Sequence, residues 1–126
     1  MEEKRIKITK TQLVDGEIST TESIGTVTNL TEDMTVLKFQ NADEAFVITF
    51  GKDEATVKTT SAGGQAHIKL KLNEMTEGRF DEGHHHLNFQ FLLKAMYHSG
   101  FNLFLEYDIS LHGDKLAENA LRTEVI

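Results

Sequence analysis

The chain has 126 residues, 39% of them hydrophobic and 26% charged, which predicts one globular domain over residues 1–126 rather than a disordered segment. Its formal net charge of −7 argues against non-specific binding to nucleic acid, because an acidic surface repels phosphate backbones. The absence of cysteine excludes disulfides and thiolate-based sites, and a cytoplasmic location is the simplest interpretation.

The sequence gives no sign of a secretory leader or a membrane span. The N-terminal residues 1–5 are mostly charged and lack the apolar core of a signal peptide. The longest apolar run, residues 89–97, is interrupted by Gln90 and Lys94 and is too short to cross a bilayer. We therefore expect no membrane partner.

The first half of the chain is predicted to form short strands joined by turns. Residues 5–13 alternate weakly, and Asp15-Gly16 is a strong signal for a two-residue hairpin. The return strand, residues 17–29, contains Gly25, which could mark a bulge or a bend. Further strands are expected at residues 34–40, 45–50, 54–60 and 67–73, with turns at 41–43, 51–53 and 61–64.

The second half contains the clearest alternation. Apolar residues occupy every odd position from Phe101 to Leu111, which is the period of a strand with one buried face. Before it, one face of a long strand is expected to carry Leu87, Phe89, Phe91, Leu93, Ala95 and Tyr97. Three apolar residues fall on faces that should be wet, and they predict cover by a neighbouring segment or a homodimer contact: Leu92, Met96 and Phe104.

The C-terminal segment, which begins at Leu116 and ends at Ile126, fits two structures. Leu116 and Ala120 would share one helical turn, whereas the residues from Asn119 onward also alternate as a strand. The tight turn at residues 112–115 favours the strand. Counted together, eight to ten such runs at spacings of roughly ten residues predict an all-β fold. Short connections favour an antiparallel up-and-down β-barrel of calycin or lipocalin type, whose closure removes exposed edges.

The triple His84-His85-His86 is the first candidate for a site. On a strand, His84 and His86 would point the same way and could bind a zinc-like ion with Asp81 or Glu82 as a third ligand. The triple lies beside a turn, however, where exposed histidines need no function. His85 is in phase with Leu87 and could lie at the end of the barrel interior. We predict no metal site and no cofactor.

No other motif predicts catalysis. The loop Ser61-Ala62-Gly63-Gly64 is followed by a strand, whereas a phosphate-binding loop needs a helix there. No Gly-x-Ser-x-Gly elbow exists, and Glu106 and Asp108 share the wet face of one strand. We therefore predict no catalytic residues and a protein that is not an enzyme.

From Gly25 onward the order of features resembles the YwiB-like family of uncharacterised bacterial proteins. The resemblance covers about three quarters of the chain and rests on residues 54–59, 66–70, 78–80, 87–97 and 100–109, followed by a short closing strand. It implies a closed calycin-like β-barrel in the bacterial cytoplasm. The family has no established catalytic residues, so the resemblance implies none for this chain.

Two functions are compatible with these observations. The first is a non-enzymatic barrel that binds a small apolar or amphipathic ligand in its interior or mouth. The alternative is a protein-interaction module, or a homodimer, that uses an outer sheet face. Filling of the barrel by aromatic side chains would argue against an interior ligand, and the candidates for such filling are Phe46, Phe50, Phe89, Phe91, Phe101 and Tyr107.

Overall fold

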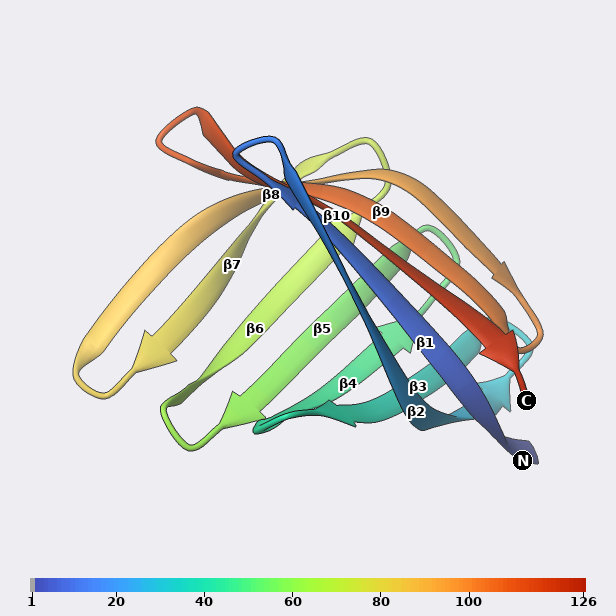
Figure 1. The fold of residues 1–126 in the computed structure, drawn as a ribbon. Coiled ribbons are helices and arrows are strands. Elements are labelled where there is room, and N and C mark those ends of the chain that lie inside the picture. Colours follow the sequence, from blue (N-terminus) through green and yellow to red (C-terminus); the bar gives the residue numbers. More distant parts are fainter. Residues whose placement is uncertain (1) are drawn as a thin grey trace.

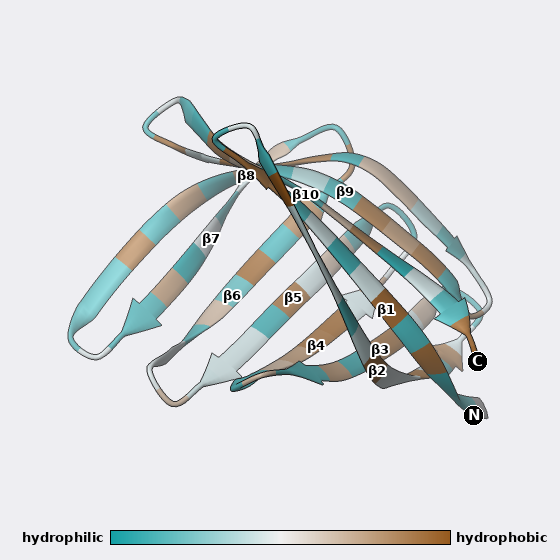
Figure 2. Cartoon of the chain, viewed as in Figure 1, coloured by the Kyte–Doolittle hydropathy of each residue, from teal (hydrophilic) through white to brown (hydrophobic). Residues whose placement is uncertain are grey.

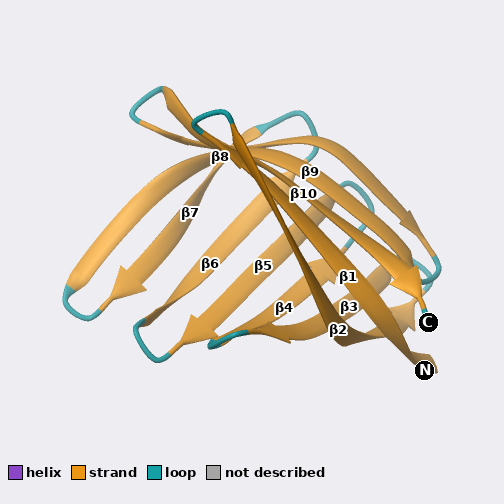
Figure 3. Ribbon diagram, viewed as in Figure 1, coloured by secondary structure: helices purple, strands orange, loops and turns teal. Residues whose placement is uncertain are grey.

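The computed structural model describes residues 2–126 as a series of β-strands joined mostly by tight turns (Figures 1 and 3). The strands are β1 (Glu2–Val14), β2 (Glu17–Thr31), β3 (Met34–Asn41), β4 (Glu44–Phe50), β5 (Glu54–Ser61), β6 (Gly64–Lys71), β7 (Met75–Glu82), β8 (His85–Ser99), β9 (Asn102–Leu111) and β10 (Asp114–Val125). The C-terminal segment is therefore a strand, as the turn before it predicted.

The strands form one closed antiparallel barrel in which each strand pairs with its neighbours in sequence. Strand β1 closes the barrel, because it pairs with β2 on one edge and with β10 on the other. This confirms the prediction of an all-β up-and-down barrel. No helix in residues 2–126 is long and apolar enough to cross a membrane.

The hairpin between β1 and β2 follows directly from its turn residues. Asp15 and Gly16 both have positive φ, 51° and 79°, which is the backbone of a type I′ turn. That turn matches the right-handed twist of the flanking strands, so Val14 pairs with Glu17 and the register continues without a shift to Glu2 and Asn29. The prediction of a two-residue hairpin at Asp15-Gly16 is therefore confirmed.

Apolar side chains form a buried core inside the barrel. Alternate residues of most strands point inward, and Figure 2 shows brown apolar bands separated by teal polar ones along the strands. Phe50, Phe91, Leu37, Leu93 and Leu105 are fully buried. Rings also stack near one end, where the centroids of Phe39 and Phe46 lie 4.6 Å apart. These side chains belong to one hydrophobic core inside the barrel.

The alternation along β8 changes phase at Lys94, and this corrects the expectation that Ala95 and Tyr97 share a face with Leu93. Pairing with β9 shifts between Leu93 and Ala95, so an extra residue separates the two halves of the strand. Beyond this bulge Met96 packs against the core and the Tyr97 side chain is 57% exposed. The expected inward row therefore ends at Leu93, and Met96 does not share an outer face with Leu92 and Phe104.

Gly25 is a site of close approach and not a bulge. Pairing of β2 with β1 continues through Gly25 without a shift, and the pairing of β2 with β3, which begins at Gly25, shifts only between Asn29 and Thr31. A Cβ on Gly25 would lie 2.3 Å from the Lys38 carbonyl oxygen and 2.7 Å from the Phe39 Cβ. Glycine is required here because the backbone of β3 occupies the space of a side chain.

Candidate functional site

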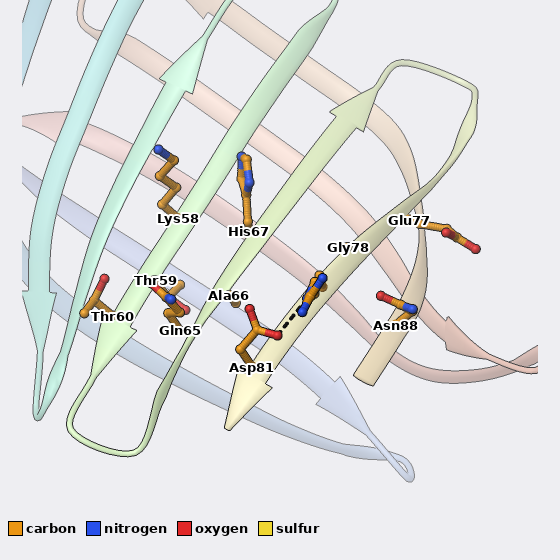
Figure 4. Close-up of a pocket in the computed structure, with 11 residues that line it drawn as sticks. Lys58, Thr59, Thr60, Gln65, Ala66, His67, Glu77, Gly78, Asp81 and Asn88 are labelled. Atoms are coloured by element: carbon orange, nitrogen blue, oxygen red, sulfur yellow. Dashed lines mark hydrogen bonds and ion pairs between the residues drawn. The ribbon is translucent and has the colours of Figure 1, made fainter. Parts of the chain in front are cut away.

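A hollow of about 540 Å³ lies on the outer wall of the barrel, over β5, β6, β7 and β8 (Figure 4). We call it the outer hollow. Its volume falls within the range of small-molecule sites, roughly 300–1,000 Å³. The polar side chains that line it include Lys58, Gln65, His67, Glu77, Asp81 and Asn88, together with Arg79.

Strand register brings these residues together. Lys58 on β5 pairs with His67 on β6, His67 pairs with Arg79 on β7, and Arg79 pairs with Asn88 on β8. Directly paired residues point to the same face, and neighbouring strands lie about 4.8 Å apart. The result is a continuous row, Lys58–His67–Arg79–Asn88, across the outer wall.

A second row lies beside the first and orients the arginine. Asp81 pairs with Gln65 on one side and His86 on the other. Arg79 Nε donates to Asp81 Oδ1 at 2.7 Å, and His86 Nδ1 donates to the same oxygen. These hydrogen bonds hold the pKa of the Asp81 carboxyl below its usual value, with the Arg79 bond as the larger cause.

The same contacts leave part of the guanidinium group available. Arg79 Nη2 lies 2.9 Å from His86 Nδ1, but that nitrogen already carries the hydrogen that Asp81 accepts. Because Asp81 occupies Nε alone, the Nη donors of Arg79 can still bind a ligand. In the described residues 2–126, Lys58 has no ion-pair partner. The hollow thus presents two cationic donors on either side of His67.

The histidine triple contributes one member to this site. His86 bonds to Asp81, whereas His84 lies in the turn before β8 and His85 pairs with Glu82. Among residues 2–126 there is no group of three or more histidine, aspartate or glutamate residues placed to hold a metal ion. The geometry of the described residues therefore gives no support to a metal site formed by His84 and His86 with Asp81 or Glu82.

Glu106 and Asp108 belong to a separate ion cluster on the outer wall of β8, β9 and β10. Lys94 Nζ lies 3.0 Å from Asp108 Oδ1 and 3.4 Å from Glu118 Oε1, and Lys115 Nζ lies 3.2 Å from the same Glu118 oxygen. Asp108 is 7% exposed under these lysines. The two lysines lower the pKa of Glu118, Lys115 more than Lys94. The carboxylates are therefore held in ion pairs that link three strands.

A smaller hollow of about 250 Å³ lies at one end of the barrel, between the ends of β4 to β7, and Glu44 lines it.

Polar side chains also lie on the inner wall of the barrel. On β1, the Lys10 amine lies 4.4 Å from the centre of the Phe46 ring. Burial lowers the pKa of Lys10, and the nearby charge of Glu44 partly opposes that shift. Asn119, 7% exposed, accepts a bond from Gln12 and leaves its own Nδ2 unpaired.

The row Lys58–His67–Arg79–Asn88 was not identified from the sequence. Each member is a polar residue in an alternating strand, and alternation alone does predict that it points outward. Which four outward residues share a row depends on the register of three strand pairs, and register is set by turn lengths and core packing. No local motif carries that information.

Comparisons with known proteins support the fold. No protein-family model matches the chain, and no curated protein matches it. The crystal structure of the ywiB protein from Bacillus subtilis is similar, with a TM-score of 0.77 over 98% of this chain and 93% of that chain. The two sequences are 12% identical, so the similarity concerns the fold alone. The chain therefore has a YwiB-like fold.

Proposed function

We propose that this protein is a non-enzymatic binding module whose recognition surface is the outer hollow, and that its ligand carries a carboxylate or phosphate group. The row Lys58–His67–Arg79–Asn88 is the observation that carries the proposal. It sets two fixed positive charges and an imidazole in line on a protein whose formal net charge is −7.

The chemistry of the row suits an oxyanion. The Nη donors of Arg79 match the paired oxygens of a carboxylate or phosphate, and Lys58 adds a point charge at the other end of the row. Asn88 and Gln65 can bond to neutral oxygens of the same ligand. The apolar side chains buried inside the barrel also favour an outer site for a charged ligand over an interior one.

Isothermal titration with inorganic phosphate and with citrate tests the proposal. We expect at least one of these anions to bind, and we expect Lys58→Met and Arg79→Met each to weaken it about tenfold, the loss of one charge-assisted hydrogen bond. Lys38→Met is the matched control, because Lys38 is exposed on β3 outside the hollow. An equal loss of anion affinity in all three variants, or no binding of either anion to the native protein, would contradict the proposal.

A second candidate is an amphipathic ligand at the barrel mouth. The buried, unpaired Nδ2 of Asn119 favours it, as does the Lys10 amine on the inner wall, because both could bind a carboxylate head group. NMR titration with decanoate distinguishes the candidates. Binding at the mouth shifts the amides of residues around Lys10 and Asn119, whereas binding at the outer hollow shifts those around Lys58 and Arg79.

We also propose that the fold is calycin-like and that the protein acts in the cytoplasm. The closed up-and-down barrel supports the first statement. The cysteine-free composition supports the second, since no part of the fold depends on an oxidising compartment. Fractionation of cells that express a tagged chain measures the location.

A further inference from the structure

The barrel has an unpaired strand edge in the first half of β2. Strand β2 pairs with β1 from Glu17 to Asn29, but it pairs with β3 only from Gly25 onward. Within the described residues, 17–24 have no strand on their other side. An edge of this kind presents backbone N–H and C=O groups that can pair with another chain.

The turn chemistry identifies which backbone groups are free. In the type I′ turn the Glu17 N–H bonds to the Val14 carbonyl, so Val14 and Glu17 form a hydrogen-bonded pair. Bonded and non-bonded pairs alternate along an antiparallel ladder. The odd residues of β2 therefore bond to β1, and the N–H and C=O groups of Ile18, Thr20, Glu22 and Ile24 face the open edge.

We propose that this edge is a self-association site, at which β2 pairs antiparallel with β2 of a second copy about a two-fold axis at Thr21. In this register Ile18 faces Ile24 of the other copy, and Thr20 faces Glu22 of the other copy. All four residues with free backbone groups then form hydrogen-bonded pairs. The Ile18 and Ile24 side chains, 71% and 49% exposed in the single chain, pack together on the outer face.

The neighbouring registers are less favourable. An axis at Glu22 would place that carboxylate directly against its own copy, and like charges in direct register are destabilising. An axis at Thr20 would pair Ile18 with Glu22 of the other copy, and Ile24 would face the hairpin turn. The axis at Thr21 alone joins the two isoleucines and separates the two glutamates.

Residues 17–24 of β2 also lack most of the features that prevent an exposed strand edge from pairing with another chain. Residues 17–24 contain no proline and no lysine, and the register shift of β2 lies at its far end, between Asn29 and Thr31. The charged residue in the middle of this edge is Glu22, and Lys7 Nζ of the same chain lies 3.9 Å from Glu22 Oε1. The second copy of this chain is thus the partner that the edge fits by its own symmetry.

Sedimentation equilibrium over a range of protein concentrations tests the association. We expect the measured mass to rise from 14.2 kDa toward twice that value. Thr20→Pro should keep the mass at the single-chain value, because it removes an N–H that faces the open edge and no bond within the barrel. Ile18→Lys should also keep the mass at the single-chain value. Met75→Lys, which changes an exposed apolar residue on β7, should leave the association unchanged. A single-chain mass for the native protein at its solubility limit would overturn the proposal.

Disulfide trapping tests the register. The native chain has no cysteine, so Thr21→Cys and Thr20→Cys each introduce one thiol. At the proposed axis the two Thr21 Cα atoms lie about 4.5 Å apart, within disulfide range, whereas the two Thr20 residues are diagonal neighbours about 7–8 Å apart. Thr21→Cys should therefore cross-link at least tenfold faster under mild oxidation. Equal rates, or faster cross-linking of Thr20→Cys, would overturn the proposed pairing.

Discussion

At the scale of the residue, Gly78 shows how tightly the barrel interior is packed. A Cβ at this position would lie 2.4 Å from Phe91 Cε2 and 3.0 Å from Ile68 Cγ1. We expect Gly78→Ala to lower the free energy of unfolding by about 1–3 kcal/mol, because the ring of Phe91 has no room to move. Gly63→Ala is the control, since a Cβ there meets no atom within 4 Å. Chemical denaturation measures both variants, and equal losses would contradict the packing described.

Tyr107 gives a second prediction at this scale. Its ring packs near Phe91, with centroids 6.1 Å apart, and burial raises the pKa of Tyr107 to about 12. The folded state therefore holds the phenolic proton more tightly than the unfolded chain does. The resulting contribution to stability is complete below the ordinary value of 10.0 and is lost as pH rises from 10 toward 12.

Absorbance titration of a Tyr97→Phe variant isolates Tyr107, because these are the two tyrosines of the chain. We expect ionisation near pH 12, unless unfolding occurs first. A midpoint near 10 in the folded protein, verified by circular dichroism at the same pH, would show that the phenol is not desolvated.

At the scale of the element, the bulge in β8 decides which side chains support the fold. Because the phase changes at Lys94, Met96 faces the core and Tyr97 faces solvent. We expect Met96→Ala to cost about 2 kcal/mol of unfolding free energy, and Tyr97→Ala to stay within about 0.5 kcal/mol. Uninterrupted alternation predicts the reverse order. Urea denaturation of the two variants distinguishes the alternatives.

The bulge also shows why alternation failed at one point. The pattern from Leu87 to Leu93 continues in the sequence through Ala95 and Tyr97, and every one of these residues is compatible with either face. The extra residue is detectable only in the pairing with β9, where Lys94 turns toward Asp108 and Glu118. Those two carboxylates lie on β9 and β10, far from Lys94 in sequence.

At the scale of the whole molecule, closure places the two chain ends together. Ile6 pairs with Val125, and the Ile126 nitrogen lies 3.5 Å from the Arg5 carbonyl oxygen. We expect a circular permutant, with the ends joined by a short glycine-serine linker and new ends between His112 and Gly113, to fold cooperatively. That break falls in the exposed turn between β9 and β10.

Thermal unfolding followed by circular dichroism measures the permutant. A second permutant, opened between Leu105 and Glu106 inside β9, is the control, because this break interrupts pairing with both β8 and β10. We expect the first permutant to unfold within a few degrees of the native chain and the second to lose its cooperative transition. Equal disruption of both would argue against the closure of β1 on β10.

The sequence by itself determined the all-β class, the positions of most turns and the inward residues of most strands. These features follow from local chemistry: the period of two, the Asp15-Gly16 turn and the absence of proline. Only the tertiary structure decided the phase of β8 beyond Lys94, the membership of the outer hollow and the open edge of β2. Each depends on register between strands, and register is set by the packing of residues that are distant in the chain.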